Sequence, residues 1–176
     1  HYGIVEHSII DIDLAQFGGS ALTSNKIKIP RGRRISEMND IPATYVPARN
    51  TVFLSIALAK AETVNSFDIF IGVNAIDYSG YPDCRPVFIS EFEKLANLAT
   101  KEAVQNKGSY KIHTPLITLS KAEIIKKGIS LKVDYSLTSS CYKPNEYGNP
   151  CGFCDACILR KKGFENAGFI DPLEYQ

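Results

Sequence analysis

The spacing of apolar and polar positions predicts two helices around a buried strand in the middle of the chain. Residues 50–64 combine apolar side chains at helical spacing with several small residues, and Asn50 can cap the first turn. Residues 68–73 form a short, mostly apolar run, which is typical of a strand buried on both faces. Residues 86–105 again carry apolar side chains at broadly helical spacing. This order predicts an α/β fold, with a parallel sheet and helices on both of its faces.

The rest of the pattern predicts one strand and two further helices. Residues 8–14 alternate late in the run, which suits a strand near a sheet edge. Ser120 and Glu123 have the spacing of a capping box, so a short helix is expected from there to about residue 127. The last helix is expected over residues 155–166.

Length and composition are those of a globular domain. The chain has 176 residues, of which 44% are hydrophobic and 22% charged, and this length suits one domain. The formal net charge of +1 gives no overall field that would attract nucleic acid, a membrane or another polyanion. No apolar run approaches the roughly 18 residues of a membrane span, so we expect a chain that does not enter membranes.

Four of the five cysteines lie close together near the C-terminus, which predicts a metal site. Their sulfurs can converge on one ion more easily than they can pair as disulfides, and tetrahedral zinc takes four thiolates. A closed shell of four ligands would make this ion structural. An iron–sulfur cluster and unligated thiols remain as alternatives. The four are Cys141, Cys151, Cys154 and Cys157.

Polar side chains gather in the loop after Val73, at the carboxyl end of the buried strand, where α/β sheets bind their ligands. Residues 74–85 contain two acids, two tyrosines, an amide, a thiol and an arginine, a set that could read a flat heteroaromatic ring. Cys84 in this loop is either a buried filler or a group that faces substrate. A packed loop with no ligand is the alternative for the whole segment.

Cations elsewhere suggest contacts with anions. Arg49 and Asn50 begin the first predicted helix, either as a cap with a surface cation or as an anion site. Lys121, in the first turn of its helix, is either solvated or paired with an anionic ligand. Residues 26–34 carry five Lys and Arg and no acid, so they form either a solvated loop or a lid that faces phosphate.

Several of these segments together resemble the 7-cyano-7-deazaguanine synthase family of the PP-loop ATP pyrophosphatase superfamily. The resemblance rests on residues 46–50, 72–86, 140–142 and 151–157, with Arg160 and the closing Asp171-Pro172. It implies an adenine nucleotide alpha hydrolase-like, Rossmann-like fold. It also divides the chain into a ligase domain over residues 1–139 and a zinc-binding segment with the last helix over residues 140–176.

The resemblance implies a carbon–nitrogen ligase of queuosine biosynthesis. It would convert 7-carboxy-7-deazaguanine and ammonia into the 7-cyano compound, using ATP with Mg²⁺ and one structural Zn²⁺. Such enzymes are cytoplasmic homodimers, with no membrane partner and no direct binding of nucleic acid expected. Carried over, the catalytic residues are Arg49, Asp83 and Lys121, of which Arg49 and Lys121 face phosphate or adenylate together with Asn50. The pocket for the base is lined by Asn50, Asp77, Tyr78, Tyr81, Asp83 and Arg85.

One motif of that family is missing from this sequence. Its phosphate-binding loop, Ser-Gly-Gly-x-Asp-Ser, does not occur, and residues 17–21 lack the acidic residue that would make them a substitute. We therefore expect that roughly 50 residues precede His1 in the native protein and that this chain alone has little catalytic activity. The alternative functions are another PP-loop enzyme that amidates or thiolates a different substrate, and a zinc-bearing module that binds tRNA.

Overall fold

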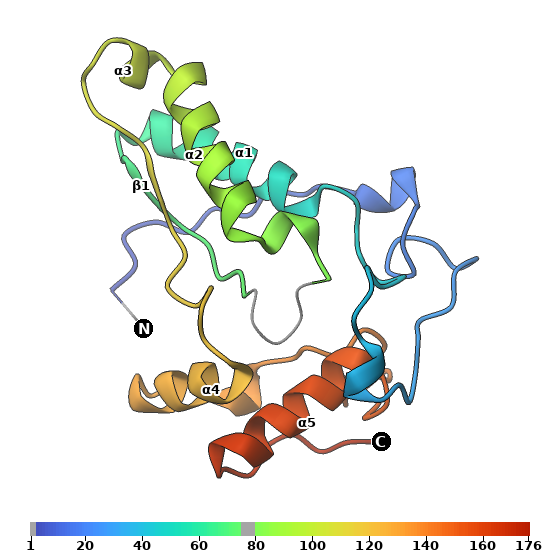
Figure 1. The fold of residues 1–176 in the computed structure, drawn as a ribbon. Helices are drawn as coiled ribbons and strands as arrows, with labels where there is room; N and C mark the ends of the chain where they lie inside the picture. Colours follow the sequence, from blue (N-terminus) through green and yellow to red (C-terminus); the bar gives the residue numbers. More distant parts are fainter. Residues whose placement is uncertain (1–2, 75–79) are drawn as a thin grey trace.

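A two-stranded parallel sheet packs against one group of helices, and a second group lies beyond its carboxyl end (Figure 1). The computed structural model describes residues 3–74 and 80–176. Strand β1 (Asp68–Phe70) pairs with β2 (Lys111–His113), and Ile69 lies opposite Ile112 in the register. Both isoleucines are buried on one face of the sheet, whereas Phe70 and His113 stack on the other face. The α/β class with a parallel sheet is therefore confirmed.

Helices α1 (Arg49–Thr63) and α2 (Pro86–Ala99) share one apolar core with the isoleucine face of the sheet. Leu54 and Leu58 of α1 share this core with Phe92 and Ala96 of α2, whereas Phe53, Leu95 and Leu98 are exposed although the apolar spacing suggested them as core positions. The short helix α3 (Lys101–Val104) follows α2 directly. Among the described residues, the loops between these elements contain 3₁₀ turns at Leu14–Phe17, Ile35–Glu37, Pro82–Cys84 and Tyr135–Leu137.

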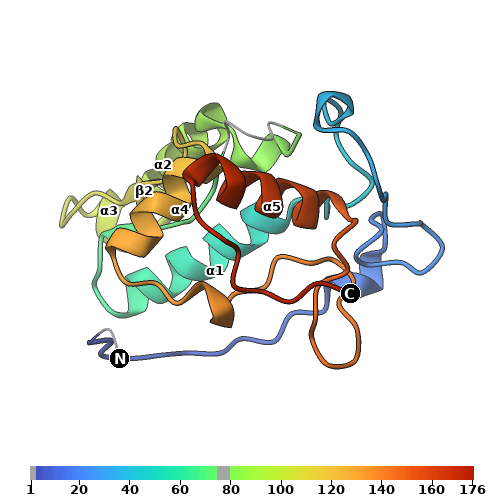
Figure 2. The same cartoon turned by 90° about the horizontal axis from the view of Figure 1, so that it is seen from below.

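Helices α4 (Lys121–Ser130) and α5 (Asp155–Ala167) form a second layer beyond the carboxyl end of β1. They lie side by side in Figure 2 and bury Ile125, Phe164 and Ala167 between them. The predicted capping box is present, because the Ser120 hydroxyl accepts the Glu123 N–H and the Glu123 carboxylate accepts the Ser120 N–H. This layer brings residues from the C-terminal half of the chain opposite the end of the sheet.

Four predicted elements differ from the structure. The strand predicted over residues 68–73 covers only Asp68–Phe70 and is buried on one face, not on both, because Phe70 is 69% exposed. Residues 8–13 form no strand and are exposed, because no second strand pairs with them. The helix predicted over residues 86–105 is interrupted by Thr100, whose buried backbone is extended and whose hydroxyl donates to the Ala96 carbonyl at 2.8 Å. Helix α4 continues past Gly128, where the missing side chain leaves room for the ring of Tyr135. No helix among the described residues is both long and apolar enough to cross a membrane.

Candidate functional site

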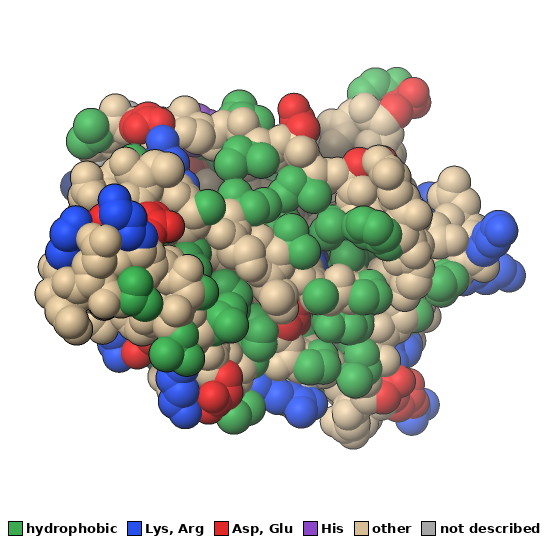
Figure 3. Space-filling view, turned by 90° about the horizontal axis from the view of Figure 1, so that it is seen from above, with side chains coloured by type: hydrophobic (Ala, Val, Ile, Leu, Met, Phe, Trp, Pro, Cys, Tyr) green, Lys and Arg blue, Asp and Glu red, His purple; other side chains and the backbone are tan. Residues whose placement is uncertain are grey.

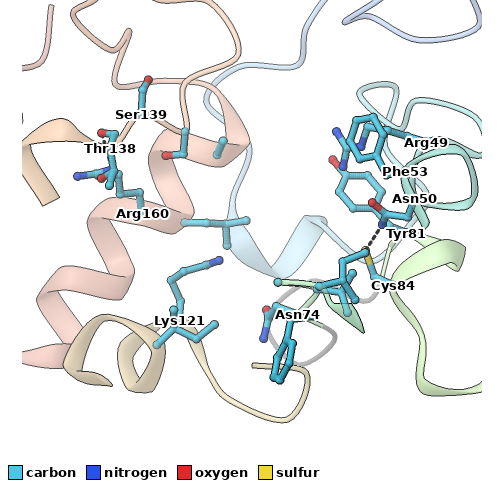
Figure 4. Close-up of a pocket in the computed structure, with 18 of the residues that line it drawn as sticks. Arg49, Asn50, Phe53, Asn74, Tyr81, Cys84, Lys121, Thr138, Ser139 and Arg160 are labelled. Atoms are coloured by element: carbon cyan, nitrogen blue, oxygen red, sulfur yellow. Dashed lines mark hydrogen bonds between the residues drawn. The ribbon is translucent and has the colours of Figure 1, made fainter. Parts of the chain in front are cut away.

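A cavity of about 730 Å³ separates the two helical layers at the carboxyl end of β1. One wall comes from α1 and the segment around Tyr81, and the other comes from α4, α5 and residues 138–140. Figure 4 shows Arg49, Asn50 and Tyr81 on the first wall and Lys121 on the second, with the Lys121 side chain extending into the space between them. The site lies at the end of the sheet where the chain pattern predicts it.

Tyr81 connects the first wall to the C-terminal part of the chain. The Arg49 guanidinium lies 5.9 Å from the centre of the Tyr81 ring, within the range of a cation–π contact. The Tyr81 hydroxyl lies 3.1 Å from that of Tyr142 and 3.4 Å from that of buried Thr44. Burial, together with the neighbouring Tyr81, raises the pKa of Tyr142, so its hydroxyl stays protonated at neutral pH. This hydroxyl chain ties the cavity wall to the residue that follows Cys141.

Asn50, Asp83 and Cys84 form a buried polar cluster at the start of α1. An Asp83 carboxylate oxygen accepts the Asn50 backbone N–H at 2.9 Å, and the Asn50 amide donates to the Asp83 carbonyl at 3.1 Å and to Cys84 Sγ at 3.2 Å. Burial and the adjacent Asp83 carboxylate raise the pKa of the Cys84 thiol. Asp83 therefore supplies the negative charge that the N-terminus of a helix favours, from a segment 33 residues away.

On the opposite wall, two contacts between elements determine the position of Lys121. The Asn74 amide, just after β1, donates to the Leu119 carbonyl at 2.5 Å and to the Leu116 carbonyl at 3.2 Å, which fixes the loop before α4. Gly163 of α5 faces the stem of Lys121 so closely that a Cβ there would lie 2.5 Å from Lys121 Cγ. Only glycine allows α5 to approach Lys121 in this way.

Arg160 also lines this wall, where it pairs with Asp171 of the C-terminal segment. The guanidinium donates to both carboxylate oxygens at 2.7 and 2.9 Å, and also to the Thr138 and Tyr135 carbonyls. Tyr175 donates its hydroxyl to the same carboxylate at 2.6 Å. Arg160 is buried and the Asp171 side chain is only 9% exposed, so the Arg160 charge is already paired within the chain.

The four C-terminal cysteines converge on one point. Their sulfur atoms all lie within 4.8 Å of one another, and Cys154 Sγ lies 3.5 Å from Cys157 Sγ. Four thiolates at about 2.3 Å from a zinc ion would be about 3.8 Å apart, so the set fits a tetrahedral ion with small adjustments. Gly148 and Gly152 have φ of 86° and 77°, which supplies the left-handed turns that bring the ligands together. The cluster can therefore hold a metal ion.

The backbone around the cluster favours the thiolate of Cys151. Burial alone would raise the pKa of Cys151, but N–H groups of Phe153 and Cys154 that donate to its sulfur lower that pKa to about 7. Burial raises the pKa of Cys157, whose proton a bound cation would displace. The basic loop packs against the cluster: Arg31 forms an antiparallel bridge with Cys154, and Arg33 Nη2 lies 2.6 Å from buried Asp155 Oδ2. A freely solvated loop over residues 26–34 is therefore not observed at Arg31 and Arg33.

Only some of the site residues that the sequence suggests line the cavity in the structure. Arg49, Asn50, Tyr81 and Lys121 line the cavity. Asp83 lies behind Asn50, and Arg85 is exposed where α2 begins. Asp77 and Tyr78 lie outside the described residues.

The sequence predicts no structural role for three residues that shape the site, although Asn74 belongs to the polar set of residues 74–85. Thr44 and Tyr142 complete the hydroxyl chain, and Asn74 holds the loop before α4. The position of Asn74 just after the buried strand could have indicated that it contributes to the site. The link between Thr44 and Tyr142 depends on contacts between distant segments, which the sequence does not indicate.

Comparisons with known proteins give a consistent picture. Residues 1–168 match the family described as "Queuosine biosynthesis protein QueC". The chain is 61% identical over 173 residues to a protein of Syntrophotalea carbinolica, covering 98% of this chain and 74% of that one. It is 62% identical over 174 residues to a protein of Citrifermentans bemidjiense, with coverage of 99% and 75%. A protein of Geobacter metallireducens is 60% identical over 173 residues, with coverage of 98% and 71%. All three relatives are named 7-cyano-7-deazaguanine synthase.

Proposed function

The chain belongs to the queuosine biosynthesis protein QueC family, and from this we propose that it acts as a 7-cyano-7-deazaguanine synthase. The substrate would be 7-carboxy-7-deazaguanine, and the nitrogen donor ammonia. A carboxylate is a poor electrophile, so ATP would first convert one of its oxygens into part of an adenylate leaving group. Ammonia would displace AMP to give the amide. A second ATP would then adenylate the amide oxygen, and departure of that oxygen with AMP, together with loss of two N–H protons, would give the nitrile.

The cation on each wall of the cavity is the observation that carries this proposal. Arg49 and Lys121 come from opposite helical layers and line one largely apolar cavity (Figure 4). No Asp or Glu is among the described residues that line it. Adenylation brings a carboxylate and a phosphate together, and these two anions need cations on both sides of the reacting carbon. We assign Arg49 and Lys121 to these anionic groups.

The first wall offers a surface for the flat base. Tyr81 presents an aromatic ring within the cavity, and Asn50 stands beside it. In our proposal Tyr81 stacks on the deazaguanine, and Asp83 acts through Asn50, whose backbone it holds. Asp77, Tyr78 and Arg85 stay in the proposed base-binding set on the strength of the family resemblance alone.

We propose zinc as the ion of the cysteine cluster and Mg²⁺ as the companion of ATP. Four thiolates with no carboxylate or open position suit structural zinc, which would hold the C-terminal fold and take no part in the reaction. Loss of metal from Cys154→Ser would leave the cavity wall at Tyr142 without its anchor.

A homodimer in the cytoplasm completes the proposal. The outer side of α2 exposes Val87, Leu95 and Leu98, at 65%, 52% and 78% of their surface. Figure 3, seen from above, shows apolar side chains gathered across the face of the molecule on which α2 lies. Apolar side chains exposed in a patch favour association with another protein surface, and here we assign that surface to a second copy.

The test measures binding of two bases by calorimetry. We expect 7-carboxy-7-deazaguanine to bind the chain saturably, and Arg49→Ala and Lys121→Ala each to weaken it about tenfold, because each removes a charge-assisted contact. 7-Deazaguanine, which lacks the carboxylate, should bind these variants and the parent chain alike. Exposed Lys107→Ala serves as the control. Absence of saturable binding of the carboxylated base would refute the proposal.

A further inference from the structure

A second cavity, of about 560 Å³, lies on the far side of Tyr142 from the site described above. Residues 21–31 form one side of it, and Tyr142 and Lys143 form the other. Tyr142 is the single residue that lines both cavities, so its ring forms a wall between them. The volume lies within the range of small-molecule sites.

The charged groups of this cavity all have the same sign. Lys28, Arg31 and Lys143 line it, and no Asp or Glu is among its described lining residues. None of the three forms an ion pair with a described residue, whereas Arg33 of the same loop pairs with Asp155 and Asp40. Figure 3 shows Lys and Arg side chains projecting at the right-hand end, which in Figure 1 is the end formed by this loop. Three cations around one hollow repel each other unless an anion joins them.

The loop that carries two of these cations is held in place. The Gly32 N–H donates to the Phe153 carbonyl at 2.8 Å, next to the backbone bridge between Arg31 and Cys154. At its other end the Ala21 N–H donates to the Ala43 carbonyl at 2.7 Å. The backbone at Arg31 and at the start of the loop is therefore held in place, which lowers the ordering cost of binding a ligand there.

We propose that this cavity binds a small anion with two or more linked phosphate groups. Lysine and arginine are the usual partners of phosphate oxygens, and three such cations suit more charge than one phosphate carries. Inorganic diphosphate and the phosphate tail of a nucleoside triphosphate share this chemistry. The alternative role of the cations is to balance the negative charge of four thiolates around a divalent ion, and it needs no further ligand.

The experiment titrates inorganic diphosphate into the metal-loaded chain by calorimetry. We expect saturable binding that the double variant Lys28→Gln/Lys143→Gln weakens at least tenfold. The control Lys94→Gln/Lys107→Gln removes the same charge from exposed lysines that pair with Glu91 and Glu102, and it should bind diphosphate as the parent does. Diphosphate bound in the first cavity would instead be weakened by Lys121→Ala and not by the double variant, so comparing the two variants separates the two cavities.

A parallel titration with ATP distinguishes the two sources of phosphate. If the double variant weakens ATP as much as diphosphate, the nucleotide tail occupies the cavity, and if it weakens only diphosphate, the free anion does. No saturable binding of diphosphate to the parent chain, or equal binding to the double variant, would overturn the proposal. Loss of bound metal in that variant without a change in diphosphate binding would assign the cations to the thiolates instead. Binding of 7-carboxy-7-deazaguanine, measured on the same samples, should stay unchanged.

Discussion

The pair of Arg160 and Asp171 joins the C-terminal segment to α5 and to the loop at Thr138. Burial acts to raise the pKa of Asp171, but the hydrogen bonds from Arg160 and Tyr175 outweigh it and hold that pKa below the ordinary value. Asp171→Asn should lower the free energy of unfolding by about 3 kcal/mol at pH 7, because Arg160 then keeps a buried charge without its partner. Urea unfolding measures this loss.

The contribution of Asp171 to the free energy of unfolding depends on pH. Because the pKa of Asp171 is lower in the folded chain than in the unfolded chain, its contribution is complete above about pH 4 and is lost as pH falls through the folded-state value. The difference between the parent and Asp171→Asn should therefore shrink as the pH is lowered toward 3. The exposed control Glu165→Gln should change stability by less than about 0.5 kcal/mol at any pH. A difference for Asp171→Asn that stays constant with pH would assign the loss to packing alone.

At the scale of residues, local signals were predictable and distant partners were not. The capping box at Ser120 and the metal site of the cysteines follow from spacing within a few residues, because each needs only its own segment. The burial of Asp83 against Asn50 depends on how a loop 33 residues away packs on α1. The sequence shows that Asp83 is an acid in a polar loop. It does not show that the Asp83 carboxylate contacts the N-terminus of α1.

At the scale of elements, the contact of α4 with α5 depends on one glycine. Gly163→Ala places a methyl group against Lys121 Cγ and 3.0 Å from Ile125 Cδ1. We expect a net loss of about 1 kcal/mol in the free energy of unfolding, because the cost of overpacking exceeds the gain in helix propensity. The displaced Lys121 should also weaken 7-carboxy-7-deazaguanine severalfold in calorimetry.

Lys162→Ala is the matched control for this variant. Lys162 is the next residue of α5 and forms only an exposed pair with Glu165 at 2.9 Å. It should leave both stability and binding nearly unchanged. Stability gained by Gly163→Ala, with unchanged binding, would contradict the close contact.

Tertiary contacts determine where several of the predicted helices and strands begin and end. The apolar pattern over residues 86–105 predicts one helix, but buried Thr100 takes an extended backbone and divides it. Residues 8–14 have a strand pattern without a partner strand and remain irregular up to Leu14. Helices α1 and α5 follow the predicted ranges closely. The predicted Asn50 cap is wrong, because Ala48 is the N-cap of α1 and the Asn50 amide donates to the Asp83 carbonyl instead.

At the scale of the whole molecule, the cysteine cluster connects segments far apart in the chain. Arg31 and Arg33 reach it from the N-terminal half, and Tyr142 carries its position to Tyr81 at the cavity. A structural ion at this junction would therefore stabilise the basic loop, α5 and one cavity wall together. The sequence indicates the ion site, but the loop that packs on it comes from residues more than 100 positions away.

Cys154→Ser tests this coupling, with Cys84→Ser as the matched control. Cys154 is fully buried and belongs to the cluster, whereas Cys84 is buried beside Asn50 and lies outside it. Cys154→Ser should release the metal, measured by elemental analysis, and limited proteolysis should then cut residues 18–34 and 140–176 while α1 and α2 stay protected. Cys84→Ser should keep its metal and the parent pattern of cleavage. If Cys154→Ser loses its metal but residues 18–34 stay as resistant to proteolysis as in the parent, the ion does not stabilise the loop. The ion pair of Arg33 with Asp155 would then hold the two segments together.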